Sequence, residues 1–159
     1  MPVVNLDRFT ELLASDRHLA VLITQSPGSV DPQVSVVNAS VVAHPVTGEP
    51  VAAVVARTGA KLANLRIRPR ATLVARCGWE WAALRGHVEL SGPDDDLGLD
   101  ADTQRTLLRR IYTAAGGQHP DMEEYDAVML RERRCALLIR ADHTWSNPSG
   151  SEHLESSAG

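Results

Sequence analysis

The feature that most constrains the fold of this chain is a succession of short apolar runs rich in β-branched residues, separated by turns or short helical segments. Turn-forming clusters such as Ser26-Pro27-Gly28-Ser29 join several successive runs, which favours antiparallel hairpins. A mainly β, single-domain antiparallel barrel with short helices is therefore expected, rather than a doubly wound α/β sheet. We predict six strands, over residues 18–24, 33–43, 51–56, 70–77, 79–91 and 135–139.

Four segments have helical spacing or helix-capping residues. Asn5 is expected to cap a helix that ends near Asp16, and Asp102 to start a helix that ends before Gly116. Asp121 and Glu124 have the spacing of a capping box for a helix that reaches Arg131. In the fourth helix, over 60–68, Leu62 and Leu65 form a buried stripe, and the opposite face carries Lys61, Asn64 and Arg68.

The length of 159 residues fits one domain. We expect residues 1–145 to form the barrel and residues 146–159 to be a mobile C-terminal tail. The N-terminal residues do not resemble a secretion signal, and no stretch approaches 18 apolar residues, so we expect a soluble, cytoplasmic protein without membrane contact. The net charge of −4 argues against binding to nucleic acid, and no spacing of Cys and His residues indicates a metal site.

Positive charge is concentrated in one interval of the chain. Between Glu49 and Glu80 there is no acidic residue, and Lys61 is the only lysine in the sequence. Six of the 16 basic residues lie in this interval, namely Arg57, Lys61, Arg66, Arg68, Arg70 and Arg76. A strand is expected to deliver the turn Arg57-Thr58-Gly59 to the start of a helix, where free backbone N–H groups favour an anion. The interval is therefore a candidate phosphate cradle, although a solvated basic helix beside the acidic loop 94–96 fits the spacing equally well.

The same interval carries a family resemblance. Residues 57–73, Arg-Thr-Gly-Ala-Lys-Leu-Ala-Asn-Leu-Arg-Ile-Arg-Pro-Arg-Ala-Thr-Leu, resemble the signature of the pyridoxamine-phosphate-oxidase-like split β-barrel superfamily, and specifically its F420-dependent oxidoreductase branch. Residues 32–35, 78–90, 116–125 and 133–134 also match that branch. The resemblance implies a split β-barrel homodimer whose cofactor sites lie at the subunit interface.

The resemblance also assigns residues to the cofactor. It implies that the phosphate-bearing tail is held by Lys61 and the turn Arg57, Thr58, Gly59 and Ala60, with Asn64 on the same helix face as Lys61. It places Gln33, Ser35 and Asn38 along the edge of the ring system, and Trp145 in a C-terminal segment that reaches the partner's cofactor. Some relatives carry arginine where this chain has Gly59, so either Arg57 replaces that charge from two positions earlier or the phosphate is bound less tightly than in those relatives.

The activity implied is transfer of a hydride between F420 and a small unsaturated or quinone-like organic substrate. The cofactor supplies the hydride, which fits the absence of a Ser/His/Asp signature or other recognisable catalytic residues. An FMN-dependent oxidase or reductase of the same fold remains an alternative, although the acidic tail of F420 would use further basic groups such as Arg66 or Arg68. A non-catalytic carrier of a flavin, deazaflavin, pyridoxal phosphate or haem is a third possibility.

Overall fold

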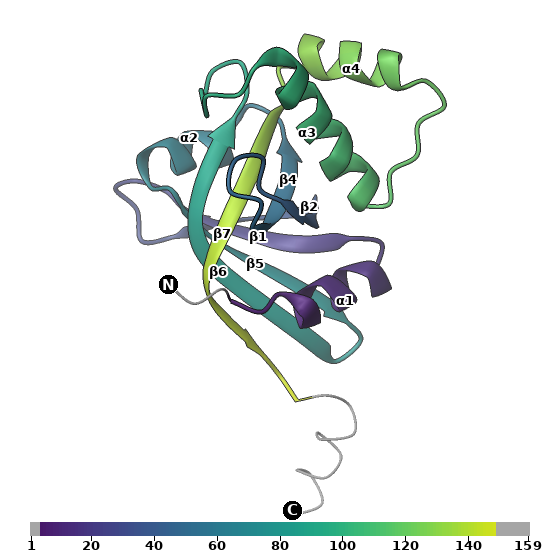
Figure 1. Ribbon diagram of the computed structural model, residues 1–159. Coiled ribbons are helices and arrows are strands. Elements are labelled where there is room, and N and C mark those ends of the chain that lie inside the picture. The colour runs from purple at the N-terminus through teal and green to yellow at the C-terminus, as the bar shows by residue number, and fades with distance from the viewer. Residues whose placement is uncertain (1–3, 149–159) are drawn as a thin grey trace, which may run out of the picture.

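A computed structural model describes residues 4–148 and shows one sheet of seven antiparallel strands with four helices around it (Figure 1). The strand order in the sheet is β2-β1-β5-β6-β7-β4-β3. The helices are α1 (Asp7–Ser15), α2 (Ala60–Ile67), α3 (Ala101–Ala114) and α4 (Met122–Arg131). The strands are β1 (Leu19–Gln25), β2 (Pro32–Asn38), β3 (Ser40–Ala43), β4 (Pro50–Ala56), β5 (Arg70–Cys77), β6 (Glu80–Ser91) and β7 (Cys135–Ser146).

The prediction of six strands was wrong, because the predicted strand 33–43 is two strands. Ala39, which is fully buried, separates β2 from β3. These two strands lie at opposite ends of the sheet, where β2 pairs with β1 and β3 pairs with β4. Since one residue connects the two edge strands, the sheet must curl until its edges meet. The result is an unclosed sheet bent around a core instead of a fully hydrogen-bonded barrel.

β7 is also longer than predicted, because its second half is polar and exposed and lacks the apolar pattern on which the prediction depended. Its first half pairs with β4, and the whole strand pairs with β6 across an irregularity at Arg85 and Gly86. Asn147 follows the strand and accepts a hydrogen bond from the backbone N–H of Trp81 at 2.8 Å. Residues 149–159 of the predicted tail lie outside the described residues.

Apolar clusters lie on both faces of the sheet, because alternate residues of β4 and β7 belong to different clusters. Helix α1 packs Phe9, Leu12 and Leu13 against the concave face, which is lined by buried residues such as Leu22 and Leu84. Helix α3 contributes a second cluster, in which Leu107, Leu108 and Ile111 pack on Val42, Val51, Ala53, Ala136 and Leu138. In Figure 1, α3 and α4 lie together at the top right and α1 lies at the bottom right. The helices therefore cover separate parts of the sheet.

The helix starts follow the predicted capping chemistry with small shifts. Asp121 is the N-cap of α4, as predicted, and accepts hydrogen bonds from the N–H groups of Glu123 and Glu124. The N-cap of α3 is Asp100, two residues before the predicted start. Leu6 is the N-cap of α1, and Asn5 accepts a hydrogen bond from the N–H of Asp7. No described helix is long and apolar enough to span a membrane.

Candidate cofactor-binding site

A cavity of about 680 Å³ lies where β2 and β4 approach one another beneath α3 and α4. Its middle is apolar, with Val36 and Val37 from β2 and Val54 and Val55 from β4. The remaining lining residues are Arg17, Asn38, Ala56, Arg57, Lys61, Ile111, Tyr112, Ala115, Gly116, Gly117, Tyr125, Met129 and Arg134. Three of the predicted cofactor-binding residues, Asn38, Arg57 and Lys61, thus lie in one cavity.

The cavity is cationic. Arg17, Arg57, Lys61 and Arg134 line it, and no described acidic residue does. Glu132 lies just outside and is 2.8 Å from Nε of Arg134 and 3.7 Å from the guanidinium of Arg57. The hydrogen bond from Arg134 is the main reason why the pKa of Glu132 is lowered. Neither Lys61 nor Arg17 has an ion-pair partner within residues 4–148, so both charges are available to a ligand.

Most of the basic side chains in residues 57–76 are already engaged. Arg66 makes a bidentate ion pair with Asp95, at 2.9 and 2.8 Å, which raises the pKa of Arg66. Arg70 pairs with Asp142 at 2.8 Å, and Arg76 donates to the carbonyl oxygen of Gly78. The interpretation as a basic helix beside an acidic loop is therefore right for Arg66, which is not free to bind a cofactor tail. Lys61, Arg68 and Arg76 are the three cations of this interval without an ion pair in the described chain, and Arg76 is engaged by the carbonyl oxygen of Gly78.

The turn before α2 is exposed and lies beside the cavity. Thr58, Gly59 and Ala60 do not line it, although Arg57 and Lys61 on either side do. Gly59 is the N-cap of α2 with φ 155° and ψ −166°, a conformation that favours glycine. No side chain caps this helix, so its first N–H groups remain open to solvent or to an anion.

Asn64 is not on a solvent-facing side of α2, in contrast to the prediction. It is 7% exposed, and its side-chain amide donates to Oε1 of Gln33 at 2.8 Å and lies 3.3 Å from Oγ1 of Thr24. The helix starts close to β1 and β2, so this face meets the sheet instead of water. Gln33 and half-buried Ser35 do not line the cavity, and Gln33 and Asn64 satisfy one another.

Trp145 lies away from the cavity. It is 36% exposed on β7, its ring stacks on His143 with centroids 5.1 Å apart, and the guanidinium of Arg85 lies 5.6 Å from its centroid. The structure therefore does not bring Trp145 to the cavity of its own subunit. A contact with a partner's cofactor remains a prediction.

Two tyrosines form an aromatic wall that the sequence analysis did not identify. The rings of Tyr112 and Tyr125 have centroids 4.6 Å apart. Tyr125 donates to the carbonyl oxygen of Leu108, and burial raises its pKa to about 12, so it stays neutral. A Cβ on Gly117 would lie 2.5 Å from the ring of Tyr112, so this position must be glycine for the ring to lie where it does.

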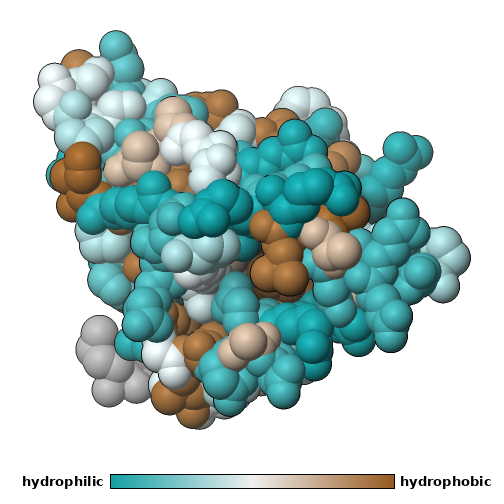
Figure 2. All heavy atoms as spheres, turned by 90° about the horizontal axis from the view of Figure 1, so that it is seen from above, coloured by the Kyte–Doolittle hydropathy of each residue, from teal (hydrophilic) through white to brown (hydrophobic). Residues whose placement is uncertain are grey.

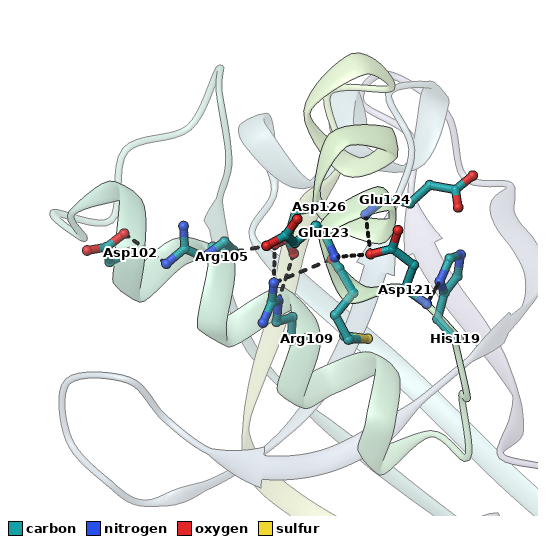
Figure 3. Close-up of polar contacts among 9 residues, drawn as sticks. Asp102, Arg105, Arg109, His119, Asp121, Glu123, Glu124 and Asp126 are labelled. Atoms are coloured by element: carbon teal, nitrogen blue, oxygen red, sulfur yellow. Dashed lines mark hydrogen bonds and ion pairs between the residues drawn. The ribbon is translucent and has the colours of Figure 1, made fainter.

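Helix α4 closes the cavity and is fastened to α3 by a polar network (Figure 3). Arg109 makes a bidentate ion pair with Asp126, and Arg105 lies 4.0 Å from the same carboxylate. The hydrogen bond from Arg109 is the main cause of the lowered pKa of Asp126. Since Tyr125 is the only buried residue described for α4, this network contributes much of what positions the helix.

A second cavity of about 410 Å³ lies on the other side of α4 and shares Met129 and Arg134 with the first. Its large apolar lining residues are Leu97, Leu99, Leu108, Met129 and Leu130. Figure 2 views the end of the molecule that carries α3 and α4 and shows hydrophobic side chains in a hollow between hydrophilic ones. Asp95 and Asp126 also line the second cavity, and both are ion-paired to arginines.

In the described part of the chain, no three His, Cys, Asp or Glu side chains gather as a metal site would require.

Sequence reasoning missed Arg17, Tyr112, Met129 and Arg134 as lining residues. They come from three segments far apart in the chain, around residues 17, 112 and 129–134, so no local spacing connects all of them. Arg134 and the Gly116-Gly117 turn did lie in segments of the family resemblance, which was the available signal. Nothing in the sequence singles out Arg17.

Comparison with known proteins identifies the fold. No family model matches the chain. A conserved hypothetical protein of Mycobacterium tuberculosis aligns with a TM-score of 0.64 and 16% identity over 91% of this chain and 84% of that one. A pyridoxamine 5'-phosphate oxidase-related, FMN-binding protein of Nostoc punctiforme aligns with a TM-score of 0.60 and 13% identity over 90% and 83%. A haem-binding protein of Mycobacterium smegmatis aligns with a TM-score of 0.57 and 14% identity over 91% of this chain and 59% of that one.

These identities are low, so the likeness concerns the arrangement of the strands and helices and not the activity. The neighbours include proteins described as binding FMN and as binding haem, together with proteins of unknown function. The expected mainly β fold with short helices is confirmed, as an unclosed sheet of seven strands instead of a six-stranded barrel. The chain has the fold of the pyridoxamine 5'-phosphate oxidase-like proteins.

Proposed function

We propose that the protein is an F420-dependent oxidoreductase that transfers a hydride between this deazaflavin and a small unsaturated or quinone-like organic molecule. The observation that carries the proposal is the cavity between β2 and β4, which is lined by four cations and by no described acidic residue. A site of this charge suits an anionic ligand, and its apolar middle suits a flat ring.

The residues present fit such a cofactor. A volume of about 680 Å³ is in the range of cofactor and ligand pockets. Val36 and Val55 offer apolar surface to a ring, and Lys61, which lacks an ion pair in the described chain, offers a charge to a phosphate. Arg57 lines the same end of the cavity, but it shares its charge with Glu132.

When bound, the deazaflavin supplies the hydride, and the protein's contribution is to bind, orient and exclude water. Tyr112 and Tyr125 form one wall, and Met129 of α4 helps to cover the cavity. The hydroxyl of Tyr125 donates a hydrogen bond to the carbonyl oxygen of Leu108, and its pKa is raised. We therefore assign this phenol a structural role and not that of a catalytic acid.

F420 fits the charges that remain better than FMN does. Beyond the phosphate, the tail of F420 carries carboxylates. Arg68, the C-cap of α2 at the helix end opposite Lys61, is exposed and has no ion pair in residues 4–148, so it is available to such a group. Arg66 no longer supports this argument, because Asp95 neutralises it. FMN and a non-catalytic carrier function are separate outcomes of the experiment below.

We also propose that the protein is a homodimer. Val34 and Val36 of β2 are 58% and 67% exposed, and they lie opposite Ile23 and Val21 on the outer face of the sheet. Val36 also lines the cavity, so a subunit that covered this apolar face would border the cofactor. The exposed stack of His143 and Trp145 lies on β7, where it would be available to that partner.

The direct test is a titration of the purified protein with F420 and, separately, with FMN, followed by fluorescence. We expect F420 to bind and Lys61→Ala to weaken it at least tenfold, about 1.4 kcal/mol. Arg66→Ala is the matched control, because the charge that it removes is already paired with Asp95. We expect it to leave the affinity for F420 within twofold of the wild type. Binding of FMN alone overturns the F420 assignment, and F420 binding without oxidation of F420H2 by any quinone or enone acceptor indicates a carrier.

A further inference from the structure

The two cavity cations without an ion pair in the described chain belong to segments that contact opposite ends of β2. The length of strand β2 gives the separation of its two contacts. Near its start, Gln33 is hydrogen-bonded to Asn64, which lies one turn after Lys61 on α2. At the other end of the strand, the side-chain amide of Asn38 donates to the backbone oxygen of Arg17 at 3.3 Å. Five residues of extended strand separate these anchors by about 16 Å.

The charges are divided unequally between the two ends. Arg57 and Arg134 are joined through Glu132, and Arg57 is close to Lys61 in the chain. Arg17 therefore stands apart, in the turn between α1 and β1. The surface between the two ends is the apolar strip of Val36, Val37, Val54 and Val55. Within the described chain no carboxylate pairs with Arg17.

The local backbone fixes where Arg17 lies. Arg17 and His18 have φ of 57° and 59°, two consecutive left-handed residues, neither of which is glycine. His18 is in turn held by the glycine turn of the cavity, since a Cβ on Gly116 would lie 3.2 Å from Cδ2 of His18. The next residue, Gly117, makes room for the ring of Tyr112. Arg17 is thus presented beside an aromatic wall by a well-defined turn.

From this arrangement we infer that Arg17 binds the carboxylate of the substrate, and that the substrate class is an unsaturated or aromatic carboxylate. The inference rests on the proposed function in one respect, since it assigns the Lys61 end to the cofactor's phosphate. An unsaturated acid of this kind would place its flat apolar part against Tyr112 and the valine strip and its charge at Arg17.

The test uses benzoate and benzamide, which have nearly the same shape and differ in charge. Their binding to the full-length protein is measured by NMR titration at constant ionic strength, without cofactor. We expect benzoate to bind at least fivefold more tightly than benzamide. Arg17→Asn, a residue that tolerates the left-handed backbone, removes this preference, and Arg17→Lys keeps most of it. Arg110→Gln removes an exposed charge from α3, outside the cavity, and leaves the preference unchanged.

A second arm separates the two possible sources of the anion. We expect Arg17→Asn to leave F420 affinity within twofold, whereas Lys61→Ala weakens it at least tenfold. If Arg17→Asn weakens F420 as strongly as Lys61→Ala does, Arg17 binds the cofactor's own carboxylates and the inference is wrong. It is equally overturned if benzoate shows no preference, or no binding at 20 mM, in the wild-type protein. Failure of F420 to bind, with an Arg17-dependent preference for benzoate, instead removes the cofactor proposal and leaves the anion subsite.

Discussion

The side-chain amide of Asn64 donates a hydrogen bond to Oε1 of Gln33 at 2.8 Å, and this contact joins α2 to the edge strand β2. Asn64 also lies 3.3 Å from Oγ1 of Thr24, which is 3% exposed. Lys61 is on the same helix, one turn earlier. The position of its charge therefore depends on the contacts by which Asn64 holds α2 against Thr24 and Gln33.

We expect Asn64→Ala to lower the free energy of unfolding by about 2 kcal/mol, because it leaves Thr24 without this partner and opens a small void. Chemical denaturation of the variant and the wild type measures the difference. Ala63→Gln changes the neighbouring exposed position of α2 and is expected to stay within about 0.5 kcal/mol. An Asn64→Ala protein as stable as the control would show that the contact contributes little.

Gly117→Ala is expected to destabilise the protein and disturb the cavity, since the new Cβ would lie 2.5 Å from the ring of Tyr112. The physical cause is overlap with one side chain, so removing that side chain relieves it. We therefore expect the cost of Gly117→Ala to be smaller in a Tyr112→Ala background, with a coupling of about 1 kcal/mol or more in a double-mutant cycle. Equal costs in both backgrounds would assign the effect to the backbone.

The ion pair between Arg109 and Asp126 predicts a pH dependence of stability. The pKa of Asp126 is lowered in the folded protein, so the pair stabilises the fold above the ordinary carboxyl pKa of about 4. This contribution is lost as the pH falls through the lowered pKa. Denaturation midpoints of wild type and Asp126→Asn are expected to differ by a constant amount from pH 5 to 7 and to converge below about pH 4.

Asp102 provides the matched control for that experiment. Its side chain is 83% exposed and, within residues 4–148, pairs only with Arg105, so Asp102→Asn is expected to shift the midpoint little at any pH. A difference between wild type and Asp126→Asn that persists unchanged at pH 3 would contradict the assignment to the ionised pair.

Val34→Glu is expected to weaken or abolish the proposed dimer, because it places a charge in the middle of an apolar face. Val34 does not line the cavity, so the substitution leaves the site itself unchanged. Sedimentation or light scattering measures the mass in solution. Val46→Glu, at a residue that is 68% exposed in the turn between β3 and β4, is the control. A protein that is monomeric without any substitution would refute the homodimer.

Much of the fold was predictable where local signals coincide with the ends of elements. The strands β1, β4, β5 and β6 were each predicted within one residue at either end, because turn residues such as Gly78 border them. The division at Ala39 was not, since no Gly or Pro marks it and both halves have strand composition, although the turn-forming residue types Asn38 and Ser40 flank it. What separates β2 from β3 is their pairing with different partners, which is a property of the whole sheet.

The site was predictable to a smaller extent. The resemblance directed attention to Arg57, Lys61 and Asn38, which the fold brings into one cavity. Helical spacing placed Asn64 on an exposed face, but tertiary contacts with Gln33 and Thr24 bury it. Arg17 was not predictable, because no sequence motif marks it. Its place beside the cavity depends on a tertiary contact, in which the backbone N–H of Ala39 donates to the carbonyl oxygen of His18, the residue after Arg17.

The position of β7 determines when the cavity can form. β7 lies between β6 and β4, so without it the chain holds two separate pieces, the group β2-β1-β5-β6 and the hairpin β3-β4. The two walls of the cavity belong to different pieces, β2 to the first and β4 to the second. Before residues 135–146 leave the ribosome, the two pieces are joined through Ala39 but share no strand pairing that would fix one wall against the other. Binding competence is a late event of biogenesis, and a nascent chain arrested before β7 exposes both unpaired edges to its neighbours.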